Sequence, residues 1–134
     1  MVIDPQGPRC GCGVRGCLEA HVGAAAIRRM GQVATPKQLS VAAQSGDRTA
    51  RRVWSDVGRL LGIGVANLIN LLNPDRVVIG GGVSEAWRWF APSLERTVRS
   101  QAMAAAFDGV RIVRATLGNQ AGIVGSAVLI WETR

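Results

Sequence analysis

The chain has 134 residues, of which 48% are hydrophobic and 19% charged, and its formal net charge is +7. This composition argues against a disordered chain and is enough for one compact domain with a buried core. The charge does not indicate nucleic-acid binding through this segment, because the arginines are scattered and no run of five or more basic residues occurs. An acidic small molecule such as a nucleotide is compatible with it. Glycines and asparagines interrupt the most apolar stretch, Leu60–Leu72, so we expect no membrane span.

The first third of the chain is predicted to contain a loop and two helices. Residues 1–3 are apolar and extended, and residues 4–16 form a loop rich in glycine, proline and cysteine. A helix follows over about residues 17–30. Thr35 is a suitable N-cap with Pro36 in the first turn, so the next helix begins there and ends near Ser45 and Gly46.

A third, long helix is predicted to follow Asp47, which is its expected N-cap. Apolar residues recur at helical spacing from Val53 to Leu72, and the sequence Asn73-Pro74-Asp75 then ends the helix. The second half of this helix is apolar on nearly all sides, which predicts that it is buried.

The remaining residues alternate between strands and helices. The β-branched run 76–79 predicts a buried strand, which leads directly into three glycines. Residues 83–106 are predicted to be helical with a break at Pro92. A second strand is expected over 110–113, and a last helix over 120–131 has small residues that would let it approach a neighbour closely. This order of elements indicates an α/β fold with parallel strands.

The cysteine loop is the strongest candidate site in the sequence. Cys10, Cys12 and Cys17 are spaced C-x-C-x4-C among glycines, which allow a short loop to fold around an ion. Zinc prefers several thiolate ligands that converge at about 2.3 Å, so this spacing predicts a zinc site rather than three free thiols. His21, the only histidine, lies four residues after Cys17 and is a candidate fourth ligand; the alternative is a surface or packed imidazole.

Two further features could bind ligands. Glu19 follows the cysteine loop at the start of a helix, where it could stabilise the helix dipole or accept hydrogen bonds from a polyol. Gly80, Gly81 and Gly82 lie between a strand and a helix, where the lack of side chains would let a nucleotide approach the backbone. A plain tight turn is the alternative for these glycines.

Three segments resemble, in order and spacing, the C-terminal half of the ROK family of bacterial sugar kinases and sugar-responsive transcriptional repressors. They are DPQGPRCGCGVRGCLEAHVG (4–23), GVANLINLLNPDRVVIGGGVS (64–84) and TLGNQAGIVGSAVL (116–129). The resemblance covers essentially the whole chain, and its cysteine element is highly specific. It implies an actin-like ATPase (ribonuclease H-like) fold of two α/β lobes, with ATP and sugar in the cleft between them. Residues 1–134 would form the C-terminal lobe, with the zinc loop over 4–17.

The resemblance also implies roles for individual residues. The cysteines matching Cys10, Cys12 and Cys17 hold a structural zinc in the family, and the glutamate matching Glu19 contacts sugar hydroxyls. The glycines matching Gly80, Gly81 and Gly82 lie against the nucleotide. ATP and Mg²⁺ are the cofactors expected of a full-length parent, whose partners would be a sugar and a nucleotide.

The chain also departs from the family pattern. The family's fourth zinc ligand is a histidine just upstream of the segment that begins here at Met1, so His21 is at best a substitute. The N-terminal lobe is missing, and with it the Asp that acts as general base on the sugar hydroxyl. We therefore expect a fragment, or a gene model that starts at an internal Met, without kinase activity on its own.

Three functions remain open from the sequence. The parent is either an ATP-dependent hexose kinase of the glucokinase type or a sugar-sensing repressor whose DNA-binding segment lies upstream. The third alternative is an unrelated small zinc module in which Cys10, Cys12, Cys17 and His21 form a complete site. For either ROK parent we expect a cytoplasmic homo-oligomer.

Overall fold

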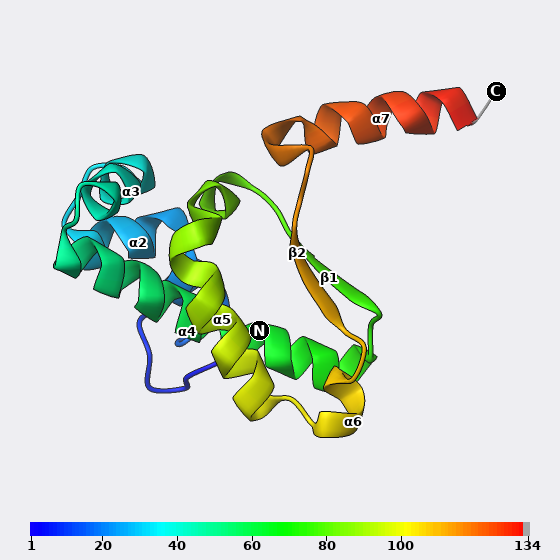
Figure 1. The fold of residues 1–134 in the computed structure, drawn as a ribbon, viewed down its shortest axis with the longest axis horizontal. Coiled ribbons are helices and arrows are strands. Elements are labelled where there is room, and N and C mark those ends of the chain that lie inside the picture. The colour runs from blue at the N-terminus through cyan, green and yellow to red at the C-terminus, as the bar shows by residue number, and fades with distance from the viewer. Residues whose placement is uncertain (133–134) are drawn as a thin grey trace.

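A computed structural model describes residues 1–132 of the chain (Figure 1). In chain order the elements are α1 (Leu18–Val22), α2 (Ala24–Gly31), α3 (Pro36–Gln44), α4 (Arg48–Leu72), β1 (Arg76–Ile79), α5 (Trp87–Gln101), α6 (Ala104–Phe107), β2 (Arg111–Arg114) and α7 (Ala121–Glu132). The 3-10 turns Gly82–Ala86 and Gly118–Gln120 precede α5 and α7. β1 and β2 pair in parallel, with Arg76 opposite Arg111 and Ile79 opposite Arg114. The predicted α/β fold with parallel strands is therefore confirmed.

Local sequence signals set the ends of the longer helices as predicted. Thr35 accepts a hydrogen bond from the Gln38 amide at 3.3 Å, and the Gln38 side chain accepts one from the Thr35 amide at 3.2 Å. This reciprocal capping box fixes the start of α3. The Asp47 carboxylate accepts hydrogen bonds from the amides of Thr49 and Ala50 at 2.7 and 3.1 Å, which starts α4. Asn73 then ends α4 in the left-handed conformation with φ 44°.

Two helix predictions were wrong. The helix expected over 17–30 is two helices, because Gly23 adopts an extended conformation (φ −65°, ψ 162°) between α1 and α2. The break expected at Pro92 does not occur, and α5 continues through it. Pro92 and Arg88 are both exposed, so water can hydrate the Arg88 carbonyl that loses its helical partner.

The core lies where α4 and α5 cross. Its largest buried side chains include Trp54, Val57 and Ile69 of α4 and Phe90, Leu94 and Val98 of α5. Two glycines of α4 bring the backbones into contact: a Cβ at Gly58 would overlap the Phe90 carbonyl, and a Cβ at Gly62 would lie 2.9 Å from the Leu94 oxygen. Because these positions lack side chains, the two helices pack at backbone distance.

Asn70 of α4 positions the segment that leads into β2. Its side-chain Nδ2 donates a hydrogen bond to the Gln101 carbonyl at 3.4 Å, and its side-chain Oδ1 accepts one from the Met103 amide at 2.8 Å. These bonds satisfy backbone groups between α5 and α6. They hold the chain where β2 can pair with β1.

Burial is less extensive than the sequence predicted in three places. Val78 of β1 is 58% exposed, and Leu71 and Leu72 at the end of α4 are 78% and 65% exposed. The helix expected to approach a neighbour closely, α7, instead projects from the rest of the fold (Figure 1). These residues are apolar, but within residues 1–132 no second layer covers them.

No helix in the described part of the chain combines the length and the apolar character needed to cross a bilayer.

Substitution of Gly58 by alanine should destabilise the fold. The added methyl group would overlap the Phe90 carbonyl, so α4 and α5 would have to separate. We expect a loss of roughly 3 kcal/mol in the free energy of unfolding, the upper end of the usual cost of overpacking. Urea unfolding followed by circular dichroism measures this. Gly125→Ala in α7 is the matched control, because no atom lies within 4 Å of its new methyl group, and equal stability losses would contradict the prediction.

Candidate functional site

The cysteine loop is folded by backbone hydrogen bonds rather than by a core. The Cys10 amide donates to the Val14 carbonyl at 2.8 Å, and the Gly13 amide donates to the Cys10 carbonyl at 3.0 Å. Gly13 has φ +89°, a conformation that favours glycine. The loop therefore makes a tight turn that brings Cys10 and Cys12 to the same side.

Gly16 closes the base of the loop. Its φ is +70°, and a Cβ there would overlap the Asp4 carbonyl, so both conformation and space require glycine. The Gly16 carbonyl accepts a hydrogen bond from the Ile3 amide at 2.9 Å, and its amide donates to the Pro8 carbonyl at 2.8 Å. These bonds hold the two ends of the loop together and place Cys17 beside the turn.

The three cysteines form one cluster, as their spacing predicted. Their sulfur atoms all lie within 4.8 Å of one another, and those of Cys12 and Cys17 are 3.5 Å apart. Tetrahedral zinc with bonds of about 2.3 Å separates neighbouring sulfurs by roughly 3.8 Å. The cluster therefore fits three corners of a zinc site with little movement. Within residues 1–132 no further His, Cys, Asp or Glu side chain joins it.

Hydrogen bonding and burial shift the pKa values of Cys12 and Cys17 in opposite directions. A hydrogen bond with the Val14 backbone, followed by one with the Cys17 thiol, lowers the pKa of Cys12. The hydrogen bond to Cys12, together with burial, raises the pKa of Cys17 to about 11. Cys12 is exposed and Cys17 is buried, so the loop presents one accessible thiol with a lowered pKa and one enclosed thiol.

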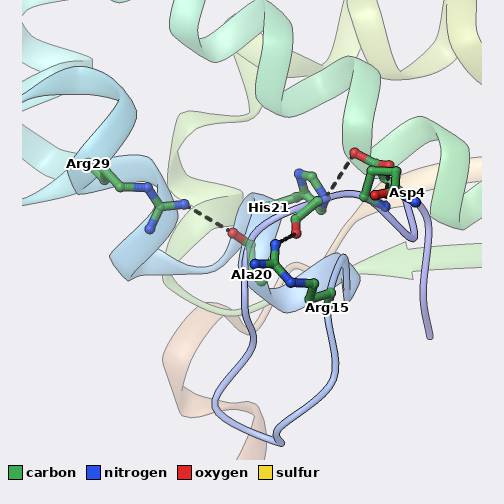
Figure 2. A network of polar contacts seen from close by, with 7 residues as sticks. Asp4, Arg15, Ala20, His21 and Arg29 are labelled. Atoms are coloured by element: carbon green, nitrogen blue, oxygen red, sulfur yellow. Dashed lines mark hydrogen bonds and ion pairs between the residues drawn. The ribbon is translucent and has the colours of Figure 1, made fainter.

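His21 is not part of this cluster. Its Nε2 is 4.0 Å from the Asp4 carboxylate, and the backbone of Gly7 packs so closely that a Cβ there would come within 2.5 Å of Nε2 (Figure 2). This nitrogen is buried and has no hydrogen-bond partner among the described residues. The structure thus places His21 as a packed imidazole rather than with the three cysteines.

Glu19 shares a cavity with the cysteine cluster. The cavity has a volume of about 560 Å³, and its lining includes Cys10, Cys12, Cys17, Glu19, Arg9 and Arg29. The Glu19 carboxylate lies over Gly23, where any Cβ would collide with it. A ligand in this cavity would therefore meet an exposed carboxylate at one wall and the candidate metal site at another.

The three glycines lie in a separate turn. Gly81 has φ +77°, and its carbonyl accepts hydrogen bonds from the Ser84 amide at 3.0 Å and the Ser84 hydroxyl at 2.7 Å. No atom lies within 4 Å of a Cβ built at Gly81 or Gly82, so the turn is open to a ligand. In Figure 1 the green turn lies by α3, well apart from the dark blue cysteine loop.

Sequence reasoning missed the side chains that α2 and α3 add to these sites. Arg29 of α2 lines the cavity beside Glu19, and its guanidinium donates to the Ala20 carbonyl at 3.3 Å (Figure 2). Lys37 and Ser40 of α3 line a smaller cavity of about 140 Å³ next to Gly82. No local motif marks these residues, because only the packing of the helices brings them to the sites.

Comparisons with known proteins identify the family. The model of the ROK family matches residues 1–133. The chain is 35% identical to a glucokinase of Thermotoga maritima over 98% of this chain and 48% of that protein. It is 34% identical to the transcriptional dual regulator NagC of Escherichia coli over 95% of this chain and 35% of that protein. The chain therefore belongs to the ROK family, and it spans half or less of the length of these relatives.

A solved structure supports the same assignment. The ROK glucokinase of Streptomyces griseus, in complex with glucose and AMPPNP, matches 96% of this chain and 49% of its own with a TM-score of 0.85 and 26% identity. The chain thus has part of the actin-like ATPase fold of ROK sugar kinases, as the sequence predicted. Its family membership rules out the alternative of an unrelated zinc module.

Loss of one cysteine should abolish metal binding. We expect the wild-type chain to retain one equivalent of zinc after dialysis, and Cys12→Ser to lose it, because two thiolates cannot hold the ion alone. Metal analysis by mass spectrometry measures the content. His21→Gln is the control and should keep zinc, since Nε2 lies with Asp4 and Gly7. Zinc loss in His21→Gln would show that the imidazole moves to the metal.

The cysteines should also differ in reactivity when the metal is removed. At about pH 8, iodoacetamide should label Cys12 before Cys17, because a lowered pKa leaves more thiolate and Cys17, with its pKa near 11, stays protonated. Peptide mass spectrometry after timed quenching gives the order. Added zinc should protect all the cysteines, and faster labelling of Cys17 would contradict the geometry of the loop.

Proposed function

We propose that this chain is the C-terminal lobe of an ATP-dependent hexose kinase of the glucokinase type. The observation that carries the proposal is the cavity that combines Glu19 with the three-cysteine cluster. The similarity to glucokinases, one of them solved with glucose and a nucleotide analogue, supports it. The activity of the whole protein would need the part of the fold that the relatives have in addition.

Each site would contribute positioning rather than chemistry. Glu19 would accept hydrogen bonds from sugar hydroxyls and so orient the sugar. Zinc held by Cys10, Cys12 and Cys17 would stabilise the loop that carries Glu19, and its fourth ligand would come from outside residues 1–132. Gly80, Gly81 and Gly82 would let the nucleotide approach the backbone, close to the positive charge of Lys37.

The reaction would be completed by the part of the fold that the relatives have in addition, which we call the complementary half. ATP, with Mg²⁺, would supply the phosphoryl group that is transferred to a sugar hydroxyl. No carboxylate of this chain matches the expected general base, which we place in the complementary half. We therefore propose that this chain is inactive alone. Homo-oligomerisation and a cytoplasmic location, where ATP is available, are part of the same proposal.

A sugar-sensing repressor is the second candidate. Its support is the 34% identity to NagC and the match to a solved ROK transcriptional regulator, a homolog of the Escherichia coli Mlc protein, with a TM-score of 0.77. In this case Glu19 would bind the sugar hydroxyls, and no phosphoryl group would be transferred. DNA binding would reside outside this segment.

A chimera tests the kinase proposal. The isolated chain should not phosphorylate glucose, whereas a chimera in which it replaces the matched half of the Thermotoga glucokinase should do so in a coupled ATP assay. Glu19→Gln in the chimera should lower kcat/KM by roughly 10- to 100-fold, because a hydrogen bond to a charged group is lost. Glu95→Gln, on the exposed side of α5, is the matched control.

Two outcomes would contradict the proposal. Phosphorylation by the isolated chain would show that the complementary half is not needed. A folded chimera that binds glucose by calorimetry but never transfers phosphate would favour the repressor.

A further inference from the structure

The cysteines of the loop differ in their access to solvent. Cys12 is exposed, Cys10 is half-buried and Cys17 is only 8% exposed. Gly11 and Gly13 flank Cys12, and no atom of the described residues lies within 4 Å of a Cβ built at either position. The tip of the loop is therefore open, and a small reagent dissolved in water would reach the Cys12 sulfur before the Cys17 sulfur.

The cavity beside the loop gives such a reagent room. All three cysteines line it together with Glu19, and its volume is about 560 Å³. A water molecule takes up about 30 Å³ in the liquid, so a molecule with two oxygen atoms fits beside the sulfurs. Space therefore does not prevent hydrogen peroxide from reaching them.

Cys12 and Cys17 are placed for a bond between their sulfur atoms. The sulfurs are 3.5 Å apart, whereas a disulfide bond is about 2.05 Å long, so the two atoms must approach by about 1.5 Å. The backbone of Cys17 is held at the base of the loop by its bridge to Val2. Gly13 lies between the two cysteines with open space around it, so the tip of the loop can supply the movement.

Cys10 is a poorer partner for either thiol. Its amide donates to the Val14 carbonyl at 2.8 Å and its carbonyl accepts a hydrogen bond from the Gly13 amide at 3.0 Å, so both of its backbone groups are fixed in the turn. Cys12 and Cys17, in contrast, already have their sulfurs within hydrogen-bond distance of each other. The geometry therefore selects one pair among the three.

We propose that Cys12 is a site of oxidation by hydrogen peroxide and that Cys17 converts the oxidised Cys12 into a disulfide, so that the loop can hold a metal only in its reduced state. The 3.5 Å separation of the two sulfurs and the open position of Cys12 carry this inference. It does not depend on kinase activity.

The chemistry requires two steps. The Cys12 thiolate attacks one oxygen of the peroxide, the O–O bond breaks, and the hydroxide that leaves takes up a proton to become water. Cys12 is then a sulfenic acid. The Cys17 sulfur attacks the Cys12 sulfur, the S–O bond breaks, and the departing hydroxyl group leaves as water with the Cys17 proton. In sum, two thiols and one peroxide give one disulfide and two waters.

The disulfide would remove two of the three thiolates that could hold zinc. Cys10 alone cannot retain the ion, because a stable site needs several converging ligands. The loop would then lose the metal that stiffens the wall of the cavity. A further consequence rests on the proposed function: Glu19 lines the same cavity, so oxidation should lower the affinity of the whole protein for its sugar.

Peptide mapping of the 134-residue chain tests the pairing. Trypsin cleaves after Arg9, Arg15 and Arg28, which places Cys10 and Cys12 in peptide 10–15 and Cys17 in peptide 16–28. After treatment of the zinc-loaded chain with hydrogen peroxide and blocking of free thiols with iodoacetamide, the two peptides should be joined, with the label on Cys10. A chromogenic chelator should detect zinc release in step with this product. Dithiothreitol followed by zinc should restore the starting state.

Matched variants separate the roles of the thiols. Cys10→Ser and Cys12→Ser are compared with the wild type without metal, so that loss of zinc does not distinguish them. Cys10→Ser should join the two peptides at nearly the wild-type rate, whereas Cys12→Ser should be at least ~10-fold slower, because the accessible thiol is absent. In Cys17→Ser, dimedone should trap a sulfenic acid on Cys12.

Four results would overturn the inference. These are equal rates in Cys10→Ser and Cys12→Ser, a disulfide mainly between Cys10 and Cys12, a sulfenic acid trapped first on Cys17, and zinc retained by a chain that contains the Cys12–Cys17 disulfide. A Cys12–Cys17 disulfide in this chain, together with a chimera that fails to phosphorylate glucose, would support the inference and remove only the kinase proposal.

Discussion

The backbone contact between α4 and α5 is the constraint on which the rest of the structure depends. Gly58 and Gly62 make it possible, because side chains at these positions would collide with Phe90, Leu94 and Thr97. A third glycine, Gly64, gives Leu18 of α1 the same kind of access to α4. The long helix thereby fixes α5 on one side and the end of the cysteine loop on another. Leu18 connects the cysteine loop to this helix, and Trp54 of the same helix lines the small cavity beside Gly82.

The cysteine loop shows how a site can be shaped without a core. Positive φ angles at Gly13 and Gly16 and a few backbone hydrogen bonds bring three thiols together, although Cys12 remains exposed. Such a loop loses little apolar contact on opening, so a bound metal would contribute much of its rigidity. The lining of the same cavity includes Glu19, and on our proposal this carboxylate would orient a sugar in either a kinase or a sugar sensor.

We propose one reason why the chain is similar to both glucokinases and repressors: both would use this part of the fold to position a sugar. Positioning a sugar requires hydrogen-bond acceptors and a rigid wall. Glu19 would supply an acceptor in the cavity, and zinc held by Cys10, Cys12 and Cys17 would stiffen its wall. Phosphoryl transfer and DNA binding require further groups, which we place outside this segment.

The sequence by itself determined the features that depend on residues a few positions apart. These include the capping of α3 by Thr35 and of α4 by Asp47, the end of α4 at Asn73, and the cysteine cluster. Only the tertiary structure decided the break at Gly23, the packing of His21 against Gly7 and the placement of Arg29 and Glu19 in one cavity. Capping and turn geometry are local, whereas burial and side-chain neighbours depend on segments far apart in the chain. For the same reason, the sequence predicted burial for Val78 and Leu72 that residues 1–132 do not supply.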